Sequence, residues 1–297
     1  MNLSILRSGV FWMIVSVLAF SAMQLFVSLT SSEITIFQQL LVRNLMGVAV
    51  AGYFLKKEKV SSWFGPKEEQ PFLIGRSIFG YLGLFTFFAA SRAGAIGDAS
   101  IINRTGPFFT TLFSVLFLKE KASRAQWTAL VIIFGGALIA GNPSFDSAAY
   151  PVIMALLSAV FNGVAYTLLA YFKDKVHPMT VILHFSVFSV LASIPFLINS
   201  YVTPAGLDIL NLFMIGLLGS LGQIGITLAY RYSPATEVSV YNQLGIVAAI
   251  LLGWAFLEEI PTWNMLTGAA IVIGTSVWIF RWNNQRRTLM ASKELHS

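Results

Sequence analysis

The chain has 297 residues, of which 56% are hydrophobic and only 11% charged, and its mean hydropathy is +0.75. Soluble domains carry about 25% charged residues, and a globular surface cannot be covered with so little charge. The composition therefore excludes a soluble enzyme, a disordered chain and a nucleic-acid-binding protein, and it predicts an integral membrane protein. Cysteine is absent, which excludes disulfides, iron–sulfur clusters and thiol chemistry.

Ten apolar segments are long enough to cross a bilayer, which takes a helix of about 20 residues. None of them alternates between apolar and polar residues, which argues against a transmembrane β-barrel. The apolar run after Arg7 is longer than the core of a signal peptide, so we interpret it as a retained helix, with a signal peptide as the alternative. In chain order the predicted helices cover 8–28, 34–55, 72–91, 96–118, 124–141, 149–172, 179–199, 208–230, 235–257 and 263–281.

Lysine and arginine gather in every second loop between these segments, and this asymmetry sets the predicted orientation. The other loops keep only Arg92, together with acidic residues. Both termini are therefore predicted to be cytoplasmic, and the net charge of +6 is a topology signal rather than a nucleic-acid-binding patch. The basic residues of the predicted inner loops are Arg7, Lys56, Lys57, Lys59, Lys67, Lys119, Lys121, Arg124, Lys173, Lys175, Arg231, Arg281, Arg286, Arg287 and Lys293.

The second half of the chain repeats the first. One fixed offset, without gaps, aligns polar and glycine residues that a chance match of apolar helices would not align. The earlier helices match more weakly at a slightly larger offset, where Arg43 falls on His184. The clearest matches are Ala90 with Ala229, Arg92 with Arg231, Asp98 with Glu237, Ser100 with Ser239, Asn103 with Asn242, Gly106 with Gly245, Glu120 with Glu259, and Gly135 with Gly274.

Two copies of five helices must cross the membrane in opposite directions, because five is an odd number. The sequence therefore predicts an all-α membrane protein built from two inverted-topology repeats, an architecture typical of secondary transporters. We predict a first repeat over residues 1–142, a second over 143–285 and a cytoplasmic tail over 286–297. The sequence leaves both a monomer and a homodimer open.

Several motifs in both halves resemble those of one transporter family. Those motifs are similar to the ten-helix EamA-type members of the drug/metabolite transporter superfamily, over nearly the whole chain. The resemblance implies transport of a small metabolite, which in similar proteins is an amino acid, a nucleoside, a sugar or another compound. The motifs are Ala93-Gly94-Ala95-Ile96-Gly97-Asp98-Ala99-Ser100, Gly106-Pro107-Phe108-Phe109, Leu116-Phe117-Leu118-Lys119-Glu120-Lys121, Gly135-Gly136, Ser233-Pro234-Ala235-Thr236-Glu237, Leu257-Glu258-Glu259 and Gly268 to Gly274.

The two halves differ at the proline that this family resemblance leads us to expect. Pro107 is present in the fourth predicted helix, but its counterpart in the ninth is Ile246. Proline removes a backbone hydrogen bond and bends a helix. We therefore expect that the two halves are not mechanically equivalent.

Arg43 and Arg104 fall inside predicted helices, where a charge costs about 2.5 to 3.5 kcal/mol. Arg43 lies near the middle of the second helix, and Arg104 lies within the fourth. We predict that both contact the substrate; for Arg43, the alternative is a structural arginine that binds helix-end carbonyls. Two cations in one cavity would favour a carboxylate or phosphate, which arginine binds through two hydrogen bonds.

The bend expected at Pro107 places further polar groups at the same depth as Arg104. We predict substrate-binding roles for Asn103 in the first half, and for Asn162, Tyr166, Tyr241, Asn242 and Gln243 in the second. The alternative for the asparagines and for Gln243 is hydrogen bonding between helices within the protein. Glu120 and Glu259, in contrast, are predicted to bind a neighbouring helix end or loop and not the substrate.

Three titratable residues are candidates for proton coupling: His184, Asp98 and Glu237. A histidine near a helix end also fits a structural role, and Asp98 and Glu237 each begin a helix, where the helix dipole stabilises a carboxylate. The sequence predicts no metal site and no cofactor site, because the three histidines do not have the spacing of metal ligands and no glycine-rich phosphate loop occurs.

Together these patterns predict a secondary transporter that exports a small carboxylate-bearing metabolite, such as an amino acid or organic anion. The predicted location is a bacterial cytoplasmic membrane, crossed several times. The alternatives are a transporter of neutral metabolites and a membrane sensor or assembly protein that transports nothing. An enzyme is not expected, since no nucleophile with its base and no carboxylate cluster is found.

Overall fold

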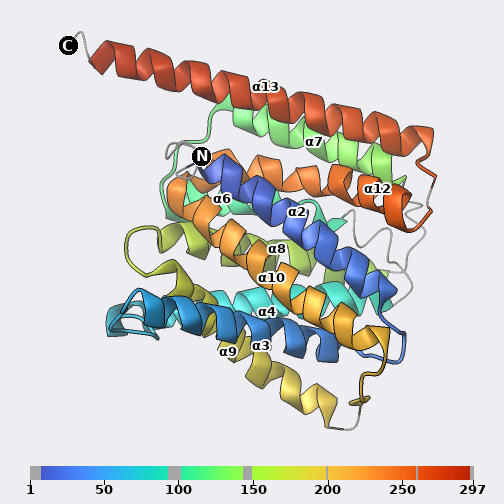
Figure 1. Cartoon of the computed structure of the whole chain (residues 1–297). Coiled ribbons are helices and arrows are strands. Elements are labelled where there is room, and N and C mark those ends of the chain that lie inside the picture. Colours follow the sequence, from blue (N-terminus) through green and yellow to red (C-terminus); the bar gives the residue numbers. More distant parts are fainter. Residues whose placement is uncertain (1–7, 93–101, 143–148, 199, 259, 295–297) are drawn as a thin grey trace.

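The computed structural model describes residues 8–92, 102–142, 149–198, 200–258 and 260–294. Within these ranges all regular secondary structure is helical, and the helices lie side by side in one bundle (Figure 1). The long helices are α2 (Gly9–Leu29), α3 (Ile36–Lys57), α4 (Gln70–Arg92), α6 (Gly106–Phe117), α7 (Arg124–Gly141), α8 (Ala149–Tyr171), α9 (Pro178–Leu197), α10 (Leu207–Tyr232), α12 (Leu244–Phe256) and α13 (Trp263–Glu294).

Seven helical segments among the described residues are both long and apolar enough to span a membrane. These segments include the whole stretch Ala235–Phe256, which joins α12 to the short helices that precede it. α3 is long enough, with 22 residues, but it carries Gln38, Gln39, Arg43 and Asn44 among its apolar residues. Polar residues inside a membrane helix mark functional positions more often than not, so α3 is a first pointer to the site.

The last helix is longer than the sequence analysis predicted. We expected the tenth segment to end at 281 and a tail to begin at 286, but α13 continues to Glu294. The residues after Arg281 include good helix formers and no glycine or proline. The helix therefore continues after the apolar segment ends, because nothing in the sequence breaks it.

Two segments that correspond in the predicted repeat are interrupted at matching positions. The fourth is helical at 102–103, turns at 104–105 and resumes as α6 at Gly106, just before Pro107. The ninth consists of α11 (Ala235–Val238), the 3-10 helix η2 (Ser239–Gln243) and α12. The bend expected at Pro107 is confirmed, and the ninth segment is interrupted without a proline.

The contacts between helices follow a regular exchange pattern. α2 packs on α10 while α8 packs on α4; α3 packs on α10 while α9 packs on α4; and α12 packs on α2 while α6 packs on α8. The predicted repeats match α2 with α8, α3 with α9, α4 with α10, α6 with α12 and α7 with α13. Replacing each helix by its counterpart turns the first contact of each pair into the second. α3 contacts its own counterpart α9, and α7 contacts its own counterpart α13.

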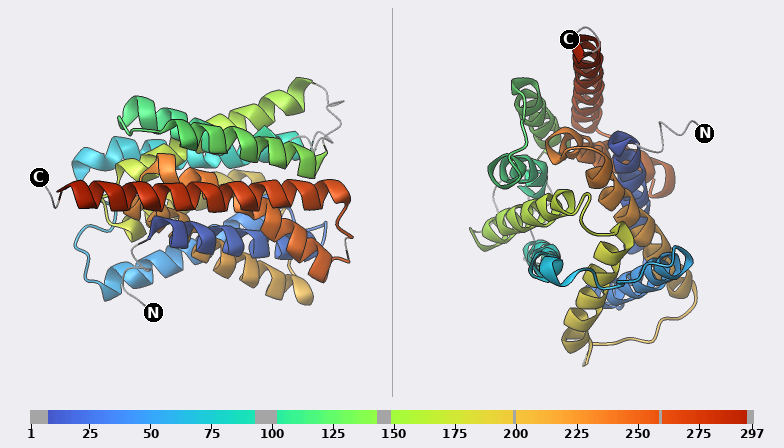
Figure 2. Two further views of the ribbon diagram at one scale, coloured as in Figure 1. Left: turned by 90° about the horizontal axis from the view of Figure 1, so that it is seen from above. Right: turned by 90° about the vertical axis from the view of Figure 1, so that its left-hand side faces the viewer.

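α7 and α13 form a pair at one edge of the bundle, as both views of Figure 2 show. A Cβ added to Gly136 would lie 2.9 Å from the Ile271 side chain, and a Cβ on Gly268 would overlap the carbonyl oxygen of Gly136. These two glycines therefore allow the two helices to pack closely. Gly135 and Gly274 have no such role, because neither has a neighbour within 4 Å of such a Cβ.

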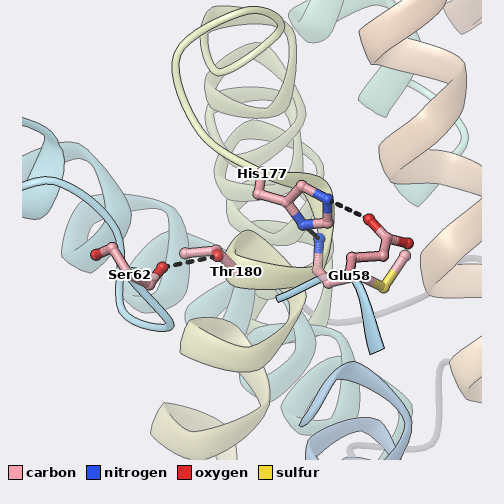
Figure 3. A network of polar contacts seen from close by, with 5 residues as sticks. Glu58, Ser62, His177 and Thr180 are labelled. Carbon is pink, nitrogen blue, oxygen red and sulfur yellow. Dashed lines mark hydrogen bonds and ion pairs between the residues drawn. The ribbon is translucent and has the colours of Figure 1, made fainter. Parts of the chain in front are cut away.

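A network of polar contacts joins the loop after α3 to the start of α9 (Figure 3). His177 Nε2 lies 2.9 Å from a carboxylate oxygen of Glu58, and the Thr180 hydroxyl donates to the Ser62 carbonyl over 3.4 Å. His177 also caps α9, because its Nδ1 accepts a hydrogen bond from the Met179 amide. The contact between α3 and α9 is thus fastened at this end by polar groups from both halves.

Candidate functional site

The centre of the bundle holds two arginines and a tyrosine that interact electrostatically. Arg43 on α3, Arg76 on α4 and Tyr166 on α8 lie near enough to one another to interact electrostatically. They come from helices of both predicted repeats, so the cluster lies where the halves meet. We call Arg43, Arg76 and Tyr166 the central cluster.

Arg43 is held against glycine in a neighbouring helix. A Cβ on Gly219 of α10 would lie 2.8 Å from Arg43 Cγ and 2.9 Å from its Nε, so only glycine leaves room for this side chain. The guanidinium carbon is 5.4 Å from the centre of the Phe20 ring. Arg43 also borders a cavity of about 140 Å³, lined further by residues of α2, α3, α4 and α10. The arginine predicted from the sequence therefore reaches a cavity between helices of both halves.

Arg76 was missed by the sequence analysis, although it lies inside the third predicted helix. Its exposure is 2%, and its guanidinium carbon stacks 4.0 Å from the centre of the Phe185 ring. Nε and Nη1 are buried without a hydrogen-bond partner among the described residues. The available signal was an arginine inside a predicted span, although Arg76 lies near the start of its span and Arg43 near the middle.

A second tyrosine, Tyr230, extends the central cluster. The rings of Tyr166 and Tyr230 are stacked, with centroids 5.8 Å apart. Tyr230 is 1% exposed and lies near the Thr110 side chain of α6. This stack joins α8 to α10, so it fills the space between these two helices next to the arginines.

His184, a candidate for proton coupling, lies at the edge of the cluster. Its Nδ1 is 2.9 Å from the Ser77 hydroxyl of α4, and it is close enough to Arg76 to interact electrostatically. The proximity to Arg76 places a titratable group beside the buried cation. It leaves both the coupling role and the structural role open.

Asn103 and Asn162 participate in a chain of hydrogen bonds that connects three helical segments. The Asn103 amide donates to the Ser158 hydroxyl over 2.6 Å, and that hydroxyl donates to the Gly83 carbonyl over 2.6 Å. Asn162 also donates to Ser158 and contacts Gly83, where a Cβ would lie 2.5 Å from its Oδ1. This arrangement is the interhelical bonding that the sequence analysis gave as the alternative for Asn103.

Arg104 and Gln243, which occupy matching positions in the predicted repeat, contact each other. The Gln243 side-chain amide donates to the Arg104 carbonyl, which the turn at 104–105 has freed. Arg104 borders a cavity of about 280 Å³ between α6, α7 and α8, and not the cavity at Arg43. The structure thus brings Arg43 together with Arg76, whereas Arg104 lies at a different cavity.

Tyr241 and Glu237 line a cavity of about 730 Å³ between α2, α13 and the interrupted ninth segment. Both side chains are buried, with exposures of 2% and 9%. Glu237 also borders a second cavity that contains Glu120 and Arg286. Asn242 follows Tyr241 in η2 and is half-buried, while Asp98 falls outside the described residues.

Glu120 binds the start of a neighbouring helix, as predicted. Its two carboxylate oxygens accept hydrogen bonds from the backbone amides of Ala235 and Thr236 over 3.1 and 3.0 Å. These amides belong to the first turn of α11, where the helix dipole favours an anion. The structural role of Glu120 is therefore confirmed, and Glu259 lies outside the described residues.

Comparison with known proteins decides the family. The sequence model of the EamA-like transporter family matches the chain twice, at residues 7–141 and 149–281. This protein belongs to the EamA-like transporter family. The resemblance seen in the sequence motifs is confirmed, and the protein is a multi-pass membrane transporter and not an enzyme.

The relatives of this EamA-like transporter move different metabolites. The pseudopaline exporter CntI of Pseudomonas aeruginosa is 30% identical over 283 residues, which cover 95% of this chain and 99% of that protein. A riboflavin transporter of Rhizobium johnstonii is 28% identical over 71% of this chain and 70% of its own length. A solved crystal structure with 18% identity covers 94% of this chain and 98% of its own, with a TM-score of 0.77, and supports the fold alone.

Proposed function

We propose that this EamA-like transporter is a secondary active exporter of a small carboxylate-bearing metabolite, such as an amino acid or an organic anion. In this proposal two inverted five-helix repeats, ten spans in all, alternate in opening a central site to each side. The membrane is the bacterial cytoplasmic membrane, and both termini lie in the cytoplasm. The central cluster binds the anionic group of the substrate.

The observation that carries the proposal is the positive charge at the centre of the bundle. Among the described residues, the ion pairs join Lys175 to Glu69 and His177 to Glu58, and none of them involves the central cluster. A buried charge needs a partner. A carboxylate on the substrate supplies it, because arginine binds carboxylates through two parallel hydrogen bonds.

Alternating access is supported by the symmetry of the contacts. The helix pairs exchange in register, and the fourth and ninth segments are interrupted at matching positions. The family model also matches the chain once in each half. In transporters with inverted repeats, broken helices line the substrate site near the middle of the membrane. The direction of transport is supported by the relative that is named an exporter.

The proposal is tested first with the substrate unknown. We expect cells that overproduce the protein to release carboxylate-bearing metabolites, and cells without it to retain them. Purified protein in liposomes should then move the same compounds. Arg43→Gln should slow this flux by about tenfold or more, because a charged hydrogen bond contributes about 1.5 to 3 kcal/mol. Arg281→Gln, at an exposed arginine of α13, is the control and should leave the flux unchanged.

Other results would point elsewhere. Flux of neutral sugars with carboxylates ignored would contradict the anionic substrate and favour a transporter of neutral metabolites. A substrate-dependent change in helix accessibility without any flux would favour a sensor or assembly protein instead.

Proton coupling through His184, Glu237 or Asp98 is the remaining part of the proposal. It is measured as the change in liposome flux when a pH gradient is imposed. Coupling requires that the gradient changes the wild-type rate, and that His184→Asn, Glu237→Gln or Asp98→Asn abolishes this change. A wild-type rate that ignores the gradient would remove proton coupling from the mechanism.

A further inference from the structure

The environment of Arg76 is shaped to hold a guanidinium and leaves two of its nitrogens without a hydrogen-bond partner among the described residues. The flat face stacks on Phe185, with 4.0 Å between the guanidinium carbon and the ring centre. A Cβ on Gly80 would lie 2.5 Å from Nη1, so glycine at that position makes the necessary space. The exposure of Arg76 is 2%, and Nε and Nη1 have no partner among the described residues.

Buried donors without partners are rare in native structures, and for a charged group they are especially unfavourable. The nearest titratable groups do not supply the missing acceptor. Arg43 adds a second positive charge, His184 adds none or another positive one, and Tyr166 is a phenol. The natural partner of an unpaired guanidinium donor is a carboxylate oxygen.

Arg43 presents a second, separate guanidinium. It comes from α3 rather than α4, lies along Gly219 of α10 and borders the cavity of about 140 Å³. Phe20 and Phe185 are different rings in different helices, so each arginine has its own aromatic support. Tyr166 lies near enough to both arginines to interact with them electrostatically, and its hydroxyl is a neutral donor for a bound group.

From this geometry we propose that the central cluster binds a substrate with two carboxylates, one on Arg43 and one on Arg76. Arg76 is then the residue that selects dicarboxylates over compounds with a single carboxylate. This inference rests on the proposed transport of a carboxylate-bearing metabolite and narrows its class. Two separate carboxylates fit better than one phosphate, because the two guanidinium groups approach from different helices and have separate supports.

The test lets the protein choose its substrate. Liposomes that contain the full-length protein are loaded with the small-molecule extract of bacterial cells, and the compounds that leave are identified by mass spectrometry. Protein-free liposomes give the background. We expect the compounds that leave faster with wild-type protein to be dicarboxylates, and succinate and L-glutamate are added as probes beside their monoamides succinamate and L-glutamine.

Variants then separate a binding role from a structural one. Arg76→Gln should lower dicarboxylate efflux by about tenfold or more, since a charged hydrogen bond is lost, and should shift the preference toward the monoamide of each pair. Arg76→Lys keeps the charge but not the paired donors, and should retain the preference with a slower rate. A folding defect would instead slow every compound alike. The control Arg281→Gln should match wild type.

Three outcomes overturn the inference, and they differ in how much of the proposed function they leave standing. If no compound leaves faster with wild-type protein than without protein, the proposed transport fails. If single carboxylates or neutral compounds leave and Arg76→Gln does not change the preference, transport stands but the dicarboxylate site is wrong. If phosphate monoesters leave instead, both arginines serve one dianionic group.

Discussion

At the residue scale, Glu120 shows how one carboxylate ties the two halves together. It follows α6 in the first half and accepts hydrogen bonds from two backbone amides at the start of α11 in the second. Glu120 therefore supplies the negative charge that is favoured at this helix end. The same amides would otherwise be left to water, because the first turn of a helix has no internal acceptors for them.

We therefore expect Glu120→Ala to destabilise the protein by about 1.5 kcal/mol or more for each bond lost. Glu120→Gln should have a smaller effect, since one amide oxygen can still accept. The melting temperature of the purified protein in detergent measures the difference, with the exposed Glu68→Gln as control. If Glu120→Ala melts like wild type, the contact contributes nothing to stability.

The candidate residues show what the sequence can and cannot predict about a site. Arg43 was identifiable from its depth alone. Arg76 lies closer to the start of its predicted span, where an arginine usually extends toward water, so its position alone does not reveal that it turns inward. Asn103 and Asn162 were recognisable as polar residues in helices, but only packing decides that they bind Ser158. A residue type at a given depth predicts that a partner is needed, and not which partner is found.

At the scale of elements, the glycines of α7 and α13 provide matched pairs of substitutions. Gly268→Ala would push a methyl group into the backbone carbonyl of Gly136, and Gly136→Ala would push one into Ile271. A backbone atom cannot rotate away, so the helices must separate. The partners Gly274 and Gly135 lie on the same two helices and face nothing within 4 Å.

Gly268→Ala should therefore lower the melting temperature, while Gly274→Ala should leave it unchanged or raise it slightly, because alanine favours a helix by about 1 kcal/mol over glycine. The same contrast should appear between Gly136→Ala and Gly135→Ala. Equal effects of the two substitutions on one helix would show that α7 and α13 do not pack as described.

The helix positions could largely be predicted from the sequence, because apolar length decides where a chain crosses a membrane. α7 begins and ends at the predicted residues 124 and 141. The interruption at Pro107 follows from local chemistry and was expected. The 3-10 turn in the ninth segment was not, because Ser239 and Gln243 reach their partners Thr111 and Arg104 in the other half only through the fold. A sequence without proline does not reveal a break that tertiary contacts impose.

At the scale of the whole molecule, the decisive question is whether the two halves have opposite orientations. The loop after α3 and the loop after α9 occupy matching positions in the predicted repeat, and the offset that pairs Arg43 with His184 pairs Ser62 with Thr203. Both residues are exposed. In an inverted repeat these two loops must lie on opposite sides of the membrane, whereas in a parallel repeat they lie on the same side.

The protein contains no cysteine, so single cysteines introduced at these two positions can be labelled without background. We expect Ser62→Cys to react with a membrane-impermeant maleimide only when the cytoplasmic face is accessible, because Lys56, Lys57 and Lys59 in that loop hold it inside. Thr203→Cys should react in spheroplasts, in which the outer face of an intact cytoplasmic membrane is accessible. Ser32→Cys, in the exposed turn between α2 and α3, is the control for the outer face. Labelling of Ser62→Cys and Thr203→Cys from one side would contradict the inverted repeat, and alternating access by exchange of equivalent halves would have to be abandoned with it.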